Sequence, residues 1–220
     1  MRYMQFAGFS GSGKTTLIAR VLAVLKNRGA RTVVLKHHGH VDAPKPHLPL
    51  SVSSKNAVQS SAFSSPALLR PDALPDSFIF LEHGATTVLL VSGETCYTYR
   101  AGRVSDATQT RGDPARYPDC LKTLDVCRYD WLLIEGFKAI PWPKFVLVRD
   151  LTDLQVVEDW PNVKAVLFPD TLTLEEAARK MNGRRAKMLP FLLRDDLSRI
   201  IPTMMQTGGI YLDPTCLGHI

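Results

Sequence analysis

The chain has 220 residues, 45% of them hydrophobic and 22% charged, so it can bury a core and is not disordered as a whole. Its 27 lysine and arginine residues exceed its 21 acidic residues by six, an excess that suits anionic ligands but is too small for a nucleic-acid binder. No apolar run could span a membrane, there is no signal-peptide core, and the four cysteines have no C-x-x-C spacing, so we predict a cytoplasmic protein with reduced thiols.

The first 36 residues have the pattern of a strand, a helix and a second strand. Residues 2–7 are half apolar and end at Gly8, which predicts a strand. From Lys14 to Arg28 the apolar residues recur at helical spacing, and Gly29 suits the left-handed position after a helix. The continuous apolar run 32–35 predicts a strand buried on both faces, as in a parallel sheet.

Residues 43–75 interrupt this pattern with six prolines and seven serines. Such a composition buries too little apolar surface to offset the entropy of ordering, so we predict a long flexible insertion. The tail from about residue 206 also predicts little regular structure. Because no repeat or second domain pattern is present, the whole chain, 1–220, is predicted to be a single domain.

Strand and helix patterns resume after the insertion. Two apolar runs on either side of Ser92-Gly93-Glu94 predict a β-hairpin. Pro202 is expected to kink or end the last helix. The expected hairpin strands are 86–91 and 95–100, the buried strands are 131–134, 145–148 and 163–168, and the helices are 114–127, 173–181 and 195–205.

The segment Gly8–Thr15 matches the phosphate-loop pattern G-x-x-x-x-G-K-[ST] and lies between a predicted strand and a predicted helix. Glycines let successive backbone N–H groups turn inward toward phosphate oxygens, and the helix N-terminus adds its positive end. Lys14 is expected to contact the β- and γ-phosphates, and the Thr15 hydroxyl is expected to bind Mg²⁺. We therefore predict an α/β fold of the P-loop NTPase class.

Glu135 is the candidate carboxylate opposite this loop. It directly follows a buried apolar run, where a charge is costly unless the strand has ended at a polar site. The carboxyl ends of parallel strands line the ligand crevice, so Glu135 is predicted to attend the magnesium and to act in catalysis.

Lys36-His37-His38-Gly39-His40-Val41-Asp42 forms a third polar cluster at a strand end. Histidine and carboxylate groups at this spacing can ligate a metal. We expect Asp42 to contact magnesium directly or through water, and Lys36 or a histidine, with His38 as the candidate, to lie near the phosphates. A polar loop without a ligand remains the alternative.

These motifs, in this order, resemble the MobB family of molybdopterin-guanine dinucleotide biosynthesis. The resemblance rests on the phosphate loop, the histidine cluster, Asp76-Ser77 with His83-Gly84-Ala85, and Ile134-Glu135-Gly136-Phe137-Lys138 followed by Pro143-Lys144. It implies a mostly parallel sheet flanked by helices, a homodimer, Mg²⁺-dependent GTP binding and slow GTP hydrolysis. It also implies partnership with MobA, the transferase that joins GMP to molybdopterin.

By position, the resemblance assigns phosphate binding to Gly11, Ser12, Gly13, Lys14, Thr15 and Thr16, and magnesium to Thr15 and Glu135. The acidic residue that follows the histidines in the family corresponds to either Asp42 or Asp76, because the insertion separates them.

Two other functions compete with this one. A small-molecule kinase could use the same loop with ATP, and a regulator could bind nucleotide without needing its hydrolysis. The chain has no Asn-Lys-x-Asp guanine motif, so the choice of guanine follows from the resemblance. Asp170, after the predicted strand 163–168, is the candidate for reading the base, because a carboxylate there could accept the guanine N–H groups.

Overall fold

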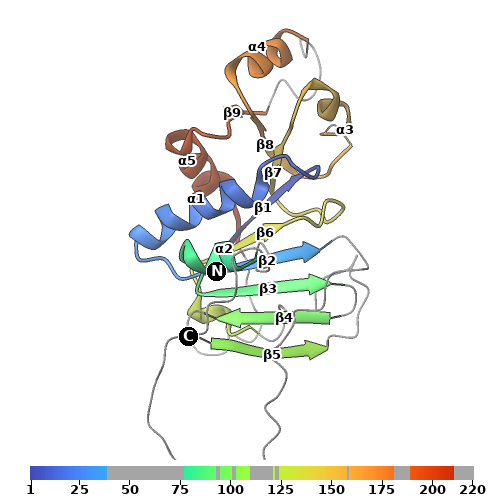
Figure 1. Cartoon of the computed structure of the whole chain (residues 1–220). Helices are drawn as coiled ribbons and strands as arrows, with labels where there is room; N and C mark the ends of the chain where they lie inside the picture. Colours follow the sequence, from blue (N-terminus) through green and yellow to red (C-terminus); the bar gives the residue numbers. More distant parts are fainter. Residues whose placement is uncertain are drawn as a thin grey trace, which may run out of the picture.

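The computed structural model describes residues 1–38, 77–92, 95–100, 103–109, 121, 124–157, 159–180 and 189–210. Its strands form one sheet, with helices on its faces (Figure 1). The predicted insertion, and the tail after residue 210, lie outside the described residues. In the described part, no helix has the length and apolar character needed to cross a membrane.

The strands of the sheet come from the whole length of the described chain. They are β1 Arg2–Gly8, β2 Thr32–His38, β3 Thr87–Ser92, β4 Thr95–Arg100, β5 Arg103–Gln109, β6 Trp131–Glu135, β7 Lys144–Leu147, β8 Val163–Phe168, β9 Phe191–Leu193 and β10 Gly209–Ile210. The α-helices are α1 Lys14–Asn27, α2 Ser77–Glu82, α3 Leu154–Val157, α4 Thr171–Lys180 and α5 Leu197–Thr207, and the 3₁₀ turns are η3 Val126–Arg128 and η4 Leu151–Asp153.

The order of the strands places β1 in the middle of the sheet. The order is β5-β4-β3-β2-β6-β1-β7-β8-β9, and β10 pairs with the start of β1. Along this order, every neighbouring pair between β3 and β9 is parallel, whereas the pairs β3–β4 and β4–β5 are antiparallel. Glu135 lies beside both Phe6 and Lys36 in register, so the carboxyl ends of β1, β2 and β6 meet at one edge.

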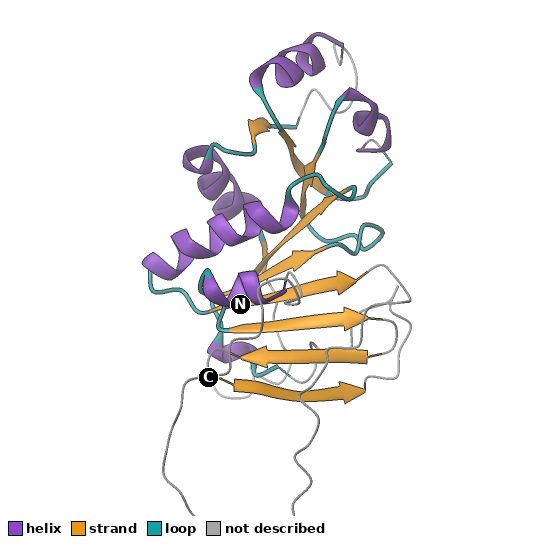
Figure 2. Cartoon of the chain, viewed as in Figure 1, coloured by secondary structure: helices purple, strands orange, loops and turns teal. Residues whose placement is uncertain are grey.

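Alternating side chains of the central strands pack against different layers. Met4 and Phe6 of β1 and Leu133 of β6 point into one core that also contains apolar residues of α1, α2 and α5. Leu132 and Ile134 of β6 point into a second core on the opposite face, and α3 and α4 cover a third core over β7 and β8. Figure 2 shows the helices around the strands of the sheet.

Most of the predicted elements are present, with shifted ends. The predicted hairpin is β3 and β4, and the three predicted buried strands are β6, β7 and β8. The strand expected to end at residue 35 continues to His38, so Lys36 and both histidines belong to β2. Pattern reading missed α2, β5, β9 and β10, of which β9 and β10 are only three and two residues long.

Two helix predictions were wrong in detail. Of the helix expected at 114–127, residues 114–120, 122 and 123 lie outside the described residues. Its described end is the single turn η3, where the Arg128 N–H donates to the Asp125 carbonyl three residues earlier. Pro202 lies inside α5 without ending it. Burial of Ile200, Ile201 and Met204 on one face of α5 offsets the hydrogen bond that the proline cannot donate.

Candidate phosphate and magnesium site

The phosphate loop connects β1 to α1, as the sequence predicts. Gly11 and Gly13 have φ angles of 75° and 86°, in the left-handed region that favours glycine, and Gly13 is the residue that precedes α1. Ser12 lies between them and is fully buried. These residues turn the chain so that the loop ends at the N-terminus of a 14-residue helix, where N–H groups can receive an anion.

Gly8 begins the loop where the backbone is most crowded. Its φ is 156°, and a Cβ atom added there would lie 2.5 Å from the Leu147 carbonyl oxygen and 2.6 Å from Ser12 Oγ. Leu147 is paired with Gly8 in the sheet, so its backbone cannot easily move away. The close approach of β1 to β7 at this position therefore requires glycine.

We expect Gly8→Ala to lower the melting temperature. Overpacking of this kind costs about 1–3 kcal/mol, which corresponds to about 2–4 °C in Tm for each kcal/mol. Gly29→Ala is the matched control, because Gly29 has a φ of 76° but no atom within 4 Å of an added Cβ. Thermal denaturation should show the larger loss for Gly8→Ala. An equal loss for the two variants would mean that backbone strain, and not the contact with β7, decides the effect.

The Lys14 ammonium reaches back over the loop. Nζ donates to the Phe9 carbonyl oxygen at 2.7 Å and lies 3.5 Å from Ser12 Oγ. Burial lowers the pKa of Lys14, the Glu135 carboxylate opposes this, and the nearby Lys138, Lys36 and Arg149 lower it further. A phosphate group placed here would relieve the repulsion among these cations.

Glu135 forms the link between the loop and the neighbouring strand. The Thr15 hydroxyl donates to Glu135 Oε1 at 2.9 Å, and Glu135 Oε2 lies 3.4 Å from Lys36 Nζ. The side chains of Glu135 and Lys36 are only 8% and 9% exposed. The pairing of β6 with β2 brings these two residues together.

This arrangement fits magnesium bound together with a nucleotide. Glu135 Oε2 is buried and has no hydrogen-bond partner in the described part of the chain, so it can accept one more ligand. Within the described residues, no cluster of three or more His, Cys, Asp or Glu side chains could hold a metal alone. One hydroxyl and one carboxylate suit Mg²⁺, which keeps several waters and shares its shell with phosphate oxygens.

The histidine cluster is only partly within the described residues. His37 lies in β2 with its ring centroid 4.8 Å from that of Phe137, on the loop after β6. His38 is the last residue of β2, at the same sheet edge as Glu135. Asp42, the third predicted magnesium residue, lies outside the described residues, so its role stays a prediction.

Asp170 has a contact that the sequence reading did not expect. Its Oδ1 accepts the Thr173 N–H at 2.8 Å, and the Thr173 hydroxyl donates to both carboxylate oxygens at 3.0 and 2.9 Å. These bonds from Thr173 hold the pKa of Asp170 below its usual range. Asp170 therefore caps α4, which begins at Thr171 and not at 173 as the capping-box pattern predicted.

Two side chains hold the loop after β6. The Gln5 side-chain amide donates to the carbonyls of Gly136 and Phe137 at 2.5 and 2.7 Å. The fully buried Lys144 donates through Nζ to the carbonyls of Lys138 and Ile140 at 2.8 and 2.7 Å, and burial lowers its pKa to about 8. Pattern reading gave Gln5 and Lys144 no role in the site, although Lys144 is part of the family motif.

Arg194 is another residue that the sequence reading missed. It directly follows β9, its backbone N–H donates to the Phe168 carbonyl, and its Nη1 donates to the Ser12 carbonyl at 3.4 Å. Arg194 therefore connects the end of β8, through its backbone, to the phosphate loop, through its guanidinium. Arg194 could be placed at this edge of the sheet only if β9 had been predicted, and β9 was missed.

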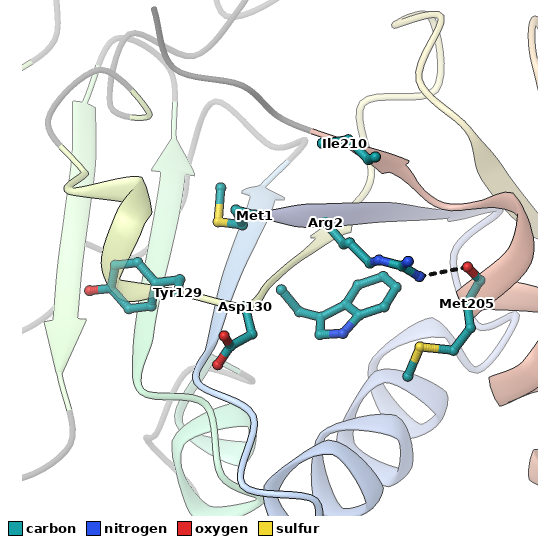
Figure 3. A pocket seen from close by; sticks show the side chains of 7 residues that line it. Met1, Arg2, Tyr129, Asp130, Met205 and Ile210 are labelled. Carbon is teal, nitrogen blue, oxygen red and sulfur yellow. Dashed lines mark hydrogen bonds between the residues drawn. The ribbon is translucent and has the colours of Figure 1, made fainter. Parts of the chain in front are cut away.

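A separate hollow lies at the opposite edge of the sheet, near the start of β1 (Figure 3). Arg2 points across it and donates to the Met205 carbonyl at 2.7 Å, and Tyr129 and Asp130 lie on its other side. Asp130 accepts from Arg31 N–H at 2.8 Å. This hollow lies at the amino-terminal end of β1, whereas the phosphate loop follows the carboxyl end of the same strand.

The chain is similar to proteins of one family. A family model described as Molybdopterin guanine dinucleotide synthesis protein B, MobB, matches residues 3–47. The chain is 28% identical over 165 residues, 75% of each chain, to a probable molybdopterin-guanine dinucleotide biosynthesis adapter protein of Bacillus subtilis. It is 27% identical over 149 residues to the adapter protein of Escherichia coli, covering 67% of this chain and 65% of that one.

Solved structures show the same fold. The crystal structure of Bacillus subtilis MobB matches with a TM-score of 0.53 and 24% identity, covering 96% of this chain and all of the other. A MobB homologue of Bacillus stearothermophilus matches with a TM-score of 0.50 and 22% identity, covering 93% and 95%. The predicted fold class, an α/β P-loop fold with a mostly parallel sheet flanked by helices, is confirmed.

Proposed function

Because the chain is a relative of the MobB proteins, we propose that it is a GTP-binding accessory protein in the attachment of GMP to molybdopterin. The names of its relatives, biosynthesis adapter proteins, support a role beside another enzyme in this step of molybdenum cofactor maturation. The chain would act as one nucleotide-binding domain, which the single sheet supports.

One observation carries the nucleotide part of this proposal. The phosphate loop ends at the N-terminus of α1, and its Thr15 hydroxyl is hydrogen-bonded to the buried carboxylate of Glu135 on the neighbouring strand. The combination is typical of a site that binds a nucleotide together with Mg²⁺: a phosphate loop, and a carboxylate oxygen 2.9 Å from the hydroxyl of its threonine.

In this proposal the residues of the site have separate tasks. The backbone of Gly11, Ser12 and Gly13 binds the phosphates together with Lys14 and Thr16. Thr15 and Glu135, with Asp42, hold Mg²⁺ and its waters, and Lys36 and His38 lie next to them. Bound Mg²⁺ would neutralise charge on the phosphates, while Lys14 and the loop orient them for slow hydrolysis.

The partners we propose are a second copy of the chain, a MobA-like guanylyltransferase in the cytoplasm, and molybdopterin as that enzyme's substrate. The test adds the purified protein and GTP to such a transferase and measures formation of the guanine dinucleotide. A faster reaction with this protein than with its Lys14→Ala variant is the expected result. Equal rates would contradict the proposed accessory role. Phosphate transfer from ATP to a metabolite would instead support the kinase alternative.

We expect GTP to bind at least about tenfold more tightly than ATP, a difference of roughly 1.4 kcal/mol. The phosphate loop cannot read the base, so a separate side chain that pairs with guanine must discriminate. If Asp170 is that side chain, Asp170→Ala will reduce the gap between GTP and ATP while triphosphate binding persists. Calorimetry with both nucleotides measures this.

Asp170 also caps α4, so the experiment needs a control for loss of the cap. Asp196 is a matched residue, because it caps α5 by accepting the Arg199 N–H at 3.2 Å. Asp196→Ala should lower helix stability without changing the ratio of GTP to ATP affinity. If both variants leave the ratio unchanged, Asp170 only caps its helix.

A further inference from the structure

The loop after β6 is held in one conformation by buried side chains. Gln5 and Lys144 together donate to four of its carbonyls, those of residues 136, 137, 138 and 140. Phe137 has a φ of 52°, a left-handed conformation that costs energy in a non-glycine residue. A loop fixed in this way sets the position of Lys138, whose own carbonyl accepts from Lys144.

Lys138 extends from this loop over the phosphate loop. Its Nζ lies 4.4 Å from the centroid of the Phe9 ring and 5.5 Å from that of Trp160. Phe9 is also the residue whose carbonyl accepts the Lys14 ammonium at 2.7 Å. Two lysines from different parts of the chain therefore meet at one residue of the phosphate loop.

The charges around Lys138 are not balanced. Lys36 has Glu135 as its partner and Arg149 has Asp153 at 2.8 Å, but Lys138 makes no ion pair with any residue that the structure describes. Arg149 also lies over the Phe9 ring, 4.9 Å from its centroid, which adds to the positive charge. Aromatic rings hold these cations near one another, where an anionic ligand would be attracted.

We propose that Lys138 binds the terminal phosphate of the nucleoside triphosphate. Glu135, the last residue of β6 before this loop, would hold Mg²⁺ together with Thr15, and the metal would supply positive charge to the terminal phosphates. Lys138 follows Glu135 by three residues and its Nζ lies over Phe9 of the phosphate loop, so its ammonium would lie at the γ-phosphate end of the ligand. Lys138 would leave its aromatic contact with Phe9 when a triphosphate arrives. Because GDP has no γ-phosphate for this ammonium to contact, the charge of Lys138 favours GTP over GDP. This inference rests on the proposed nucleotide function.

The experiment compares the binding of a non-hydrolysable GTP analogue and of GDP by calorimetry. Lys138→Ala should weaken binding of the GTP analogue about tenfold, the effect of losing one charge-assisted phosphate contact, and change GDP binding less than about twofold. Lys138→Arg, which keeps the charge, should retain most of the preference. Lys180→Ala is the matched control, because Lys180 pairs with Glu176 on exposed α4.

The results separate this inference from the proposed function. If the unchanged protein binds neither nucleotide, the proposed function fails. If it binds GTP and Lys14→Ala weakens this binding, but Lys138→Ala keeps the same ratio of GTP-analogue to GDP affinity, only the role of Lys138 is overturned.

A second variant tests the aromatic contact. Phe9→Leu keeps an apolar side chain but removes the ring that holds Lys138 in the absence of ligand. The effects of Phe9→Leu and Lys138→Ala on the affinity ratio should not add, because both act on the same ammonium group. Additive effects would show that Phe9 acts through packing, and would overturn the proposed exchange of Lys138 between the Phe9 ring and the terminal phosphate.

Discussion

Lys14→Ala should weaken nucleotide binding by about 10- to 100-fold while the protein stays folded. We expect the ammonium to donate charge-assisted hydrogen bonds to phosphate oxygens, each worth about 1.5–3 kcal/mol, and 1.4 kcal/mol is a factor of ten in affinity. In the structure its Nζ is held by the Phe9 carbonyl and lies beside Ser12 Oγ, at the point where a phosphate would enter. Isothermal titration with the GTP analogue measures the loss.

Lys26→Ala is the control for this experiment. Lys26 is an exposed residue of the same helix, in its last turn, and lies about 18 Å further along the helix axis. It should have unchanged affinity, because screening by salt removes most interaction over that distance. Unchanged affinity in both variants would mean that the glycine-rich turn merely starts α1 and binds no phosphate.

Glu135→Gln should lower the Mg²⁺-dependent rate of GTP hydrolysis about 10²-fold, the scale of losing one positioned catalytic group. The amide keeps the size of the side chain and can still accept from the Thr15 hydroxyl. It removes the negative charge from an oxygen that is buried and has no hydrogen-bond partner among the described residues. Single-turnover assays across a magnesium series measure the effect.

The same substitution removes the charge of the Glu135 carboxylate beside the buried Lys36 ammonium, so a moderate fall in Tm is also expected. Asp130→Asn controls for stability, since Asp130 holds Arg31 at the opposite edge of the sheet. That variant should lose stability and keep its turnover. A wild-type rate in Glu135→Gln would remove Glu135 from the site.

Local pattern was enough to predict the strand and helix on either side of the candidate phosphate loop, which are contiguous in sequence. The phosphate loop is recognised from its glycines, Lys14 and Thr15, because strand, turn and helix follow one another there. Glu135 was recognised from its place after a buried run. The hydrogen bond between Thr15 and Glu135 links residues 120 positions apart, and only the strand order brings them together.

The residues that support the loop after β6 could not be predicted in this way. Gln5 is a polar residue within a strand pattern, and its partners are 131 and 132 residues away. Lys144 begins a strand and would be expected in solvent, yet it is fully buried because its ammonium is bonded to two carbonyls. Arg194 follows a strand too short to give a periodic signal.

The position of β6 between β1 and β2 has a consequence for synthesis of the chain. The first βαβ unit is complete by residue 38, but its two strands are not neighbours, because β6, at 131–135, pairs with both. At roughly 5–20 residues per second, a ribosome needs about 5–20 s to make the intervening segment. If the nascent unit folds in this time, the edges of β1 and β2 that later pair with β6 keep unpaired backbone N–H and C=O groups. The strands β3 and β4, which pair antiparallel with each other, are made during this interval, so either could pair with β1 or β2 in the position that β6 later occupies.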